Sequence, residues 1–265
     1  MKSTWRLVHT GNNAAAMNMA IDEALMIRQK EDALPTLRFY GWTHPSFSFG
    51  YFQKILEEVN VPKCREEGIG LVRRPTGGGT VIHGWDLTYT VAVPLDNPLV
   101  PKNILESYRL IHHCIIEGLQ QLNVKAEHFS EQSGSKEKLP NICLTNPTRY
   151  DVLIDGKKVA GAAQRRKQGV MLHQGYIALD MPADEMTNLF SMQDDLSQFV
   201  IATSTAINAV SQYPVDRKKL AHAIASGFET VLNIRLVAEG LNQMEIDTAD
   251  ELVETKYGTD TWNFR

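Results

Sequence analysis

Three consecutive glycines, Gly77–Gly79, interrupt an otherwise strand-like stretch, Arg73–His83 (RRPTGGGTVIH). Glycine loses more backbone entropy on folding than any other residue, so such a run is tolerated where the chain needs its conformational freedom. The run predicts a loop whose backbone approaches a ligand closely and turns N–H groups toward a carbonyl, carboxylate or phosphate. The alternative is a bulge or tight bend between two strands. The stretch lacks both the Gly-Lys-Ser/Thr of a Walker A loop and the G-x-G-x-x-G spacing of dinucleotide-binding proteins.

The polar residues beside the glycines leave their roles open. Arg73 and Arg74 alternate along a strand, so only one of them can face the same side as a ligand held by the loop. His83 ends the stretch. A histidine beside a strand is commonly a hydrogen-bonded structural residue, and catalysis is the alternative.

Composition excludes several classes of protein. The 265 residues include 27 Lys and Arg against 31 Asp and Glu, a net charge of −4, which gives no reason to expect a nucleic-acid partner. No run approaches the roughly 18–20 apolar residues of a membrane span, and the amino-terminal hexapeptide lacks the apolar stretch of a secretion signal. Three widely spaced cysteines without a Cys-x-x-Cys pair argue against a disulfide framework or a zinc site. We therefore expect a cytoplasmic protein with free thiols, no metal and no membrane partner.

The hydrophobic pattern predicts an α+β fold. The expected helices span 18–28, 59–67, 102–122, 183–190, 216–232 and 247–257. The expected strands span 36–42, 46–52, 71–74, 80–83, 87–94, 151–154, 158–162 and 170–179, the last three as a meander. Their order lacks the regular strand–helix alternation of a doubly wound sheet. With no internal repeat and no dividing linker, residues 1–265 are expected to form a single domain.

Among the cysteines, Cys143 is the candidate nucleophile. It lies between a polar loop and a strand, whereas Cys114 belongs to the apolar stripe of a long helix and is expected in the core. Cys64, in a short helix, fits either a structural or a reactive role. A lone cysteine is usually structural, so Cys143 alone does not establish a reaction.

A lysine on a strand of small residues is the second candidate. Lys158 follows the Asp155-Gly156 hairpin signal, and simple alternation places it on one face with Ala160 and Ala162. The small residues predict room for a narrow substrate channel. A lysine near a thiol lowers the thiol pKa, and near an acyl carbonyl it stabilises the developing oxyanion. The alternative is a solvated hairpin lysine.

Three motifs in order resemble the lipoate–protein ligase and octanoyltransferase branch of the biotin/lipoate ligase superfamily. They are the glycine-rich stretch RRPTGGGTVIH, the lysine stretch DGKKVAGAA and the carboxyl-terminal KYGTDTWNF. The resemblance runs from about residue 5 to residue 265, with a motif-bearing core of about 32–246. It implies a single catalytic domain with a mixed, curved β-sheet and flanking helices, and no carboxyl-terminal accessory domain. It also implies a tunnel for a lipoyl or octanoyl chain, with Lys158 as the essential lysine.

The residues that the resemblance assigns to substrate binding are Arg74, Gly77, Gly78, Gly79, Thr80, His83, Gly161, Ala162 and His173. A structural role for His173 is equally compatible with the sequence.

The sequence around Cys143 resembles that of one branch of this family. Cys143, Pro147 and Tyr150 match the Cys-x-x-x-Pro-x-x-Tyr of cysteine-dependent octanoyltransferases, fifteen residues before Lys158. This resemblance implies transfer of an octanoyl group from acyl carrier protein, through a thioester on Cys143, to a lysine of a lipoyl domain or glycine-cleavage H protein. It implies no cofactor, and a monomer is the default expectation.

Three alternatives remain. The first is a lipoate–protein ligase that uses ATP and Mg²⁺ and works with a separate accessory subunit; Gly79 favours it, because the third glycine is ligase-like. The second is an amidotransferase that moves octanoyl or lipoyl groups between lipoyl-bearing proteins. The third is a carrier of such groups without activity.

Overall fold

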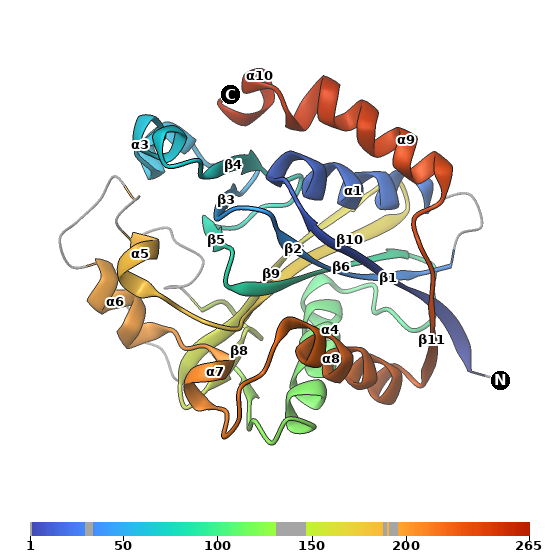
Figure 1. The fold of residues 1–265 in the computed structure, drawn as a ribbon. Coiled ribbons are helices and arrows are strands. Elements are labelled where there is room, and N and C mark those ends of the chain that lie inside the picture. The colour runs from blue at the N-terminus through green and yellow to red at the C-terminus, as the bar shows by residue number, and fades with distance from the viewer. Residues whose placement is uncertain (1, 30–33, 131–146, 188–189, 191–195) are drawn as a thin grey trace.

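A large mixed β-sheet forms the centre of the molecule. The computed structural model describes residues 2–29, 34–130, 147–187, 190 and 196–265 (Figure 1). In this part of the chain, eight strands form the main sheet in the order β11-β1-β2-β6-β10-β9-β8-β7. The strand β1 runs parallel to both of its neighbours, and every other pair in this sheet is antiparallel.

The strands of the main sheet are β1 (Ser3–Asn13), β2 (Thr36–Trp42), β6 (Asp86–Pro94), β7 (Glu127–His128), β8 (Val152–Ile154), β9 (Lys157–Lys167), β10 (Val170–Ala178) and β11 (Ile234–Ala238). A smaller sheet pairs β3 (Ser46–Phe49) with β4 (Gly70–Arg73) in parallel and with β5 (Val81–His83) in antiparallel orientation.

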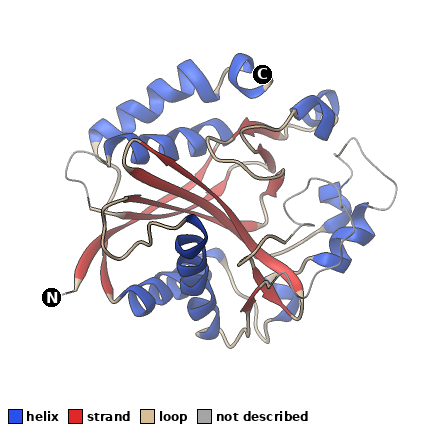
Figure 2. Cartoon of the chain, turned by 180° about the vertical axis from the view of Figure 1, so that it is seen from behind, coloured by secondary structure: helices blue, strands red, loops and turns tan. Residues whose placement is uncertain are grey.

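Helices cover both faces of the main sheet (Figures 1 and 2). On one face lie α4 (Ile104–Gln120) and α8 (Arg217–Leu232), which bury their apolar sides against the sheet. On the other face lie α1 (Ala15–Arg28), α9 (Gln243–Leu252) and a π-helical turn, η2 (Val253–Tyr257). The remaining helices are α2 (Ile55–Glu58), α3 (Val61–Glu66), α5 (Ala183–Thr187), α6 (Leu196–Thr203), α7 (Ile207–Val210) and α10 (Asp260–Asn263).

Polar side chains fix where the main helices begin. Asn103 and Asp216 accept backbone N–H groups at the starts of α4 and α8, so donors that the helix leaves unpaired are satisfied. Asn242 and Glu245 form a reciprocal capping box at the start of α9. No helix in the described ranges is long and apolar enough to span a membrane.

The structure agrees with the predicted α+β order and corrects several details. Strands β1, β7 and β11 and helices α2, α6, α7 and α10 were not predicted. The strand expected at 46–52 ends at Phe49, and the last long helix begins at Gln243 rather than 247. The helix expected at 183–190 is described as α5 only to Thr187, because residues 188–189 lie outside the described ranges. The predicted core position of Cys114 is confirmed.

Candidate active site

A pocket lies where the main sheet, α1 and the smaller sheet meet. It contains about 390 Å³ of unfilled space. Its wall is formed by Met19, Tyr40, Trp42, Ser48, Arg74, Gly78, Val81, His83, Thr88, Gly161, Ala162, Ala163, Gln174, Gly175 and Tyr176. Five of the residues predicted to bind substrate are among them: Arg74, Gly78, His83, Gly161 and Ala162. The structure therefore brings the glycine loop and the lysine strand to one cavity.

Arg74 holds the glycine loop in shape. Its Nη2 donates to the carbonyl oxygens of Gly77 and Gly79, at 2.9 and 2.8 Å. Its Nη1 donates to the carbonyl oxygen and to Oγ of Ser48, at 2.5 and 2.7 Å. Arg73 instead bonds to carbonyl oxygens of the carboxyl-terminal segment and of the chain after β3. Of the two alternating arginines, Arg74 is thus the one that faces the loop.

Within the described ranges, no acceptor is hydrogen-bonded to the N–H groups of Gly77, Gly78 and Gly79. Gly78 has a φ of +88°, which other residues rarely adopt, and it lines the pocket. Successive N–H groups in such a turn form a binding site for an anion or a polarised carbonyl oxygen.

A second chain of hydrogen bonds holds the residue that precedes the glycines. Thr76 Oγ1 donates to Gln174 Oε1 at 2.8 Å, and Gln174 Nε2 donates to Asp22 Oδ2 at 2.7 Å. Asp22 is fully buried and forms a 2.6 Å ion pair with the equally buried Arg38. The loop is therefore fixed from α1 and β10 as well as through Arg74.

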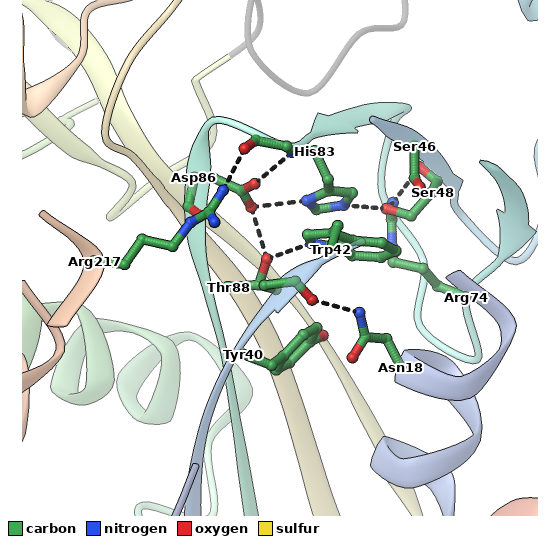
Figure 3. Close-up of polar contacts among 12 residues, drawn as sticks. Asn18, Tyr40, Trp42, Ser46, Ser48, Arg74, His83, Asp86, Thr88 and Arg217 are labelled. Carbon is green, nitrogen blue, oxygen red and sulfur yellow. Dashed lines mark hydrogen bonds and ion pairs between the residues drawn. The ribbon is translucent and has the colours of Figure 1, made fainter. Parts of the chain in front are cut away.

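His83 lies at the centre of a buried polar network (Figure 3). Its Nδ1 lies 2.8 Å from Asp86 Oδ2, and its Nε2 lies 2.7 Å from Ser48 Oγ. Its ring stacks on Trp42, with ring centres 4.1 Å apart. Because Ser48 also accepts from Arg74, a continuous chain of contacts connects Asp86 to the glycine loop.

Asp86 is the anchor of this network. Burial alone would raise the pKa of its carboxyl group, but the His83 ring, the Thr88 hydroxyl and the Gly84 amide outweigh burial, so the pKa is lowered. Arg217, at the start of α8, donates to the backbone carbonyls of Asp86 and Gly84. The network is thereby attached to a helix more than 130 residues away in the sequence.

Lys158 is buried beside the pocket. Its side chain is 1% exposed, and its Nζ lies 2.7 Å from Oδ2 of the fully buried Asp151. Asp151 also accepts from the Tyr108 hydroxyl at 2.6 Å and from the Thr148 amide at 2.7 Å. A buried charge needs a partner and further hydrogen bonds, and this pair has both. The alternative of a solvated hairpin lysine is therefore excluded for Lys158.

A β-bulge decides which way Lys158 points. Between β8 and β9, Val152 pairs with Ala160, but the next residue, Leu153, pairs with Lys158, so β9 holds one extra residue. The prediction that Lys158 shares a face with Ala160 is wrong for this reason. A Cβ on Gly161 would lie 2.7 Å from Lys158 Cε and 2.8 Å from Nζ, so the lysine occupies the space that glycine leaves open.

Three predicted residues support the loop without lining the pocket wall. Gly77 and Gly79 supply the two carbonyls that Arg74 binds. Thr80 is fully buried, and its hydroxyl accepts from Gln53 Nε2 at 2.9 Å.

His173 lies elsewhere. It is fully buried on β10, where its ring approaches Tyr89, Tyr108 and His112 rather than the pocket. Burial lowers the pKa of His112 to about 4 and that of His173 well below its ordinary value. The structure therefore does not bring His173 to the pocket wall.

Cys143 falls within residues 131–146, outside the described ranges. The end of its motif is described, and Thr148 bonds to Asp151, the carboxylate partner of Lys158.

Sequence reasoning missed Ser48, Asp86 and Asp151. The three-residue spacing from His83 to Asp86 was a usable signal, because a carboxylate so close can reach the ring. No local pattern indicates Ser48 or Asp151, whose contacts join separate parts of the chain.

Comparisons with known proteins agree with this geometry. The family model described as the lipoyl protein ligase A/B catalytic domain matches residues 14–229. The chain belongs to this family. The octanoyltransferase LipM of Bacillus subtilis is 38% identical to this family member over 276 residues, covering 100% of this chain and 99% of that protein. The LipM of Staphylococcus aureus is 34% identical, with complete coverage of both chains.

Solved structures of lipoate ligases share the fold. A bi-partite lipoate protein ligase from Thermoplasma acidophilum superposes with a TM-score of 0.84 at 25% identity, covering 99% of this chain and 96% of that one. A lipoate-protein ligase A bound with ATP gives 0.81 at 26% identity, covering 100% and 99%. The predicted family and fold class are confirmed, and the predicted acyltransferase branch agrees with the names of the full-length relatives.

Proposed function

We propose that this family member transfers an octanoyl group from octanoyl-acyl carrier protein to a lysine of a lipoyl domain or glycine-cleavage H protein, through a thioester on Cys143. The observation that carries the proposal is the placement of Lys158, buried and paired with Asp151, against Gly161 in the wall of the pocket. Full-length relatives named as octanoyltransferases support the choice of reaction.

The pocket suits an acyl chain. Its wall is mostly apolar or made of small residues, and the polar groups are concentrated at the glycine loop and His83. Burying methylene groups contributes about 0.8 kcal/mol each, so an octanoyl chain could gain roughly 5 kcal/mol from its apolar part. The carbonyl end would then lie near the loop N–H groups.

Acylation follows from these positions. The Cys143 thiolate attacks the thioester carbonyl, and loop N–H groups or the Lys158 ammonium stabilise the oxyanion. The attack gives a tetrahedral intermediate. Its collapse breaks the bond to the carrier's sulfur, which leaves as a thiolate and takes up a proton, and octanoyl-Cys143 remains. No ATP is needed, because the incoming acyl group is already a thioester.

Transfer then requires a neutral amine. The acceptor lysine, with an ordinary pKa of about 10.4, must lose a proton as it attacks the acyl-enzyme. The amide bond forms, the Cys143 sulfur leaves as a thiolate, and that thiolate restores the starting state. The proton that the amine releases passes to solvent, and the Lys158 ammonium stabilises the oxyanion as it does in the first step.

The other two cysteines are poor nucleophiles. Cys64 and Cys114 are both fully buried. Burial raises the pKa of the Cys64 thiol to about 11 and that of Cys114 further still. Because thiolates are the reactive form, this supports Cys143 as the acylated residue.

Intact-mass measurement after incubation with octanoyl-acyl carrier protein, without ATP, tests the proposal. We expect a hydroxylamine-sensitive gain of one octanoyl group that maps to Cys143. The Cys143→Ala variant should form no adduct, and Cys64→Ala serves as the matched control. Undiminished transfer by Cys143→Ala would refute the mechanism.

An ATP- and Mg²⁺-dependent ligase is the second candidate. Gly79 and the structural likeness to a bi-partite lipoate protein ligase favour it. This candidate predicts that the protein forms a lipoyl-adenylate from lipoate and ATP, and that Cys143→Ala does so at the same rate. If wild-type protein and Cys143→Ala both form that adenylate and neither forms an acyl-enzyme, the protein is a ligase.

A further inference from the structure

A second cavity borders the glycine loop. This outer groove contains about 540 Å³ of unfilled space and is lined by Tyr51, Phe52, Pro75, Thr76, Gly77, Gln164 and Arg165. Gly77 lines the outer groove, whereas the next residue, Gly78, lines the pocket of the candidate active site. Two consecutive residues of the glycine loop therefore line two different cavities.

Basic side chains gather around an aromatic residue in the outer groove. The guanidinium groups of Arg265 and Arg165 lie 4.2 and 5.4 Å from the ring centre of Tyr51. Hydrogen bonding to Arg265 and the nearby positive charges lower the pKa of the Tyr51 hydroxyl. Phe52, beside it, is 87% exposed.

These cations lack carboxylate partners. In the described part of the chain, no Asp or Glu lies within ion-pairing distance of Arg165 or Arg265. Acidic residues outnumber basic ones in this protein, so two guanidinium groups that lie over one ring without a carboxylate partner need an explanation. A bound anion is the simplest explanation.

Strand β9 connects the outer groove to Lys158. Gly161, Ala163 and Arg165 alternate along one face of the strand, and the bulge places Lys158 beside Gly161 on that same face. Ala163 lies next to the glycine loop, where its Cβ is 3.6 Å from the position of a Cβ on Gly78. Four residues of strand span about 13 Å, a separation that an extended pantetheine arm covers.

We propose that the outer groove binds the phosphate of the donor's phosphopantetheine arm, with Arg165 and Arg265 as its ligands. This inference rests on the proposed transferase function. Guanidinium groups form paired, charge-assisted hydrogen bonds to phosphate oxygens. The exposed Phe52 and the Tyr51 ring contact the apolar part of the arm, which leads the thioester past Gly77 into the site.

A pair of donors that differ only in the phosphate tests this assignment. We would compare kcat/KM for acyl-enzyme formation from octanoyl-4′-phosphopantetheine and from octanoyl-pantetheine, by intact mass. Wild-type protein should prefer the phosphorylated donor by about tenfold, the effect of roughly one charge-assisted hydrogen bond. Arg165→Gln and Arg265→Gln should bring this ratio toward one. Arg235→Gln, an exposed arginine on the distant edge strand β11, is the matched control and should keep the ratio.

The outcomes separate this inference from the proposed function. Equal rates from both donors with wild-type protein would overturn the phosphate site while leaving the transferase function intact. An equal loss for both donors in Arg165→Gln and Arg265→Gln would also overturn it, since the arginines would then only support the loop. If neither donor acylates wild-type protein, the transferase function and this inference are both refuted.

Discussion

Lys158 and Asp151 form a 2.7 Å ion pair in which the two side chains are 1% and 0% exposed. The hairpin between β8 and β9 brings these residues together, and the bulge in β9 turns the lysine toward the pocket. Asp151 also holds Thr148, so one carboxylate connects Lys158 to the end of the cysteine motif. Asp151 thus positions the Lys158 ammonium group without itself lining the pocket.

Replacing that carboxylate should be costly. In Asp151→Asn the Lys158 ammonium remains buried without a counter-ion, so the free energy of unfolding should fall by about 3–5 kcal/mol. Urea unfolding measures this loss. Asp155→Asn, at the exposed hairpin turn, should be within about 0.5 kcal/mol of wild type. An Asp151→Asn protein as stable as wild type would show that the ion pair is not maintained in solution.

Adding one methyl group at Gly161 should displace the lysine. The new Cβ in Gly161→Ala would lie 2.7 Å from Lys158 Cε, closer than real side chains approach. We expect acyl-enzyme formation to slow by at least about tenfold, because misplaced catalytic groups lose that much or more. Gly240→Ala, where no atom lies within 4 Å of the added Cβ, is the control. Unchanged single-turnover rates in Gly161→Ala would mean that Lys158 is not held as described.

Ser48 should matter although it is not predicted to react. In Ser48→Ala, Arg74 and His83 each lose a hydrogen-bond partner in a buried site, at a cost of about 1–3 kcal/mol in unfolding free energy. The glycine loop should also be less well fixed, so acylation should slow. Thermal unfolding and single-turnover acylation measure the two effects. The neighbouring Ser46→Ala, which loses a single bond to His44, should change acylation little; equal effects of both variants would contradict the proposed chain of contacts.

Two buried histidines should make stability depend on pH. Burial lowers the pKa of His112 to about 4 and that of His173 well below its ordinary value, so both are neutral in the folded protein. The unfolded chain binds protons at these sites below about pH 6.5. Unfolding free energy should therefore fall as pH falls from about 6.5 toward 4, by about 1.4 kcal/mol per pH unit for each histidine.

Urea unfolding at several pH values tests the histidine prediction. His112→Gln should have a shallower dependence on pH than wild type in this window. His222→Gln, at an exposed position on α8, should keep the wild-type slope. An unchanged slope in His112→Gln would show that His112 does not remain neutral in the folded protein.

Local pattern was sufficient for much of the framework. The aromatic and β-branched residues of β2 and β6 predicted these central strands, and the Asp155-Gly156 turn predicted the hairpin beside them, because such side chains between turn signals are typical of strands. The edge strands β11 and β7 were missed, and so was β1, which lies between β11 and β2. The segment of β1 is only partly buried and carries polar residues through its second half, so it lacks a clear period.

The amino-acid sequence by itself determined the glycine loop, the lysine motif and the family, because these depend on residue types at short spacing. Only the tertiary structure decided which arginine faces the loop, that Asp86 and Ser48 hold His83, and that Asp151 partners Lys158. Each of these depends on which strands become neighbours. A single bulged residue in β9 reverses the direction of the side chains before it, and no alternation read along one strand reveals a pairing made with another.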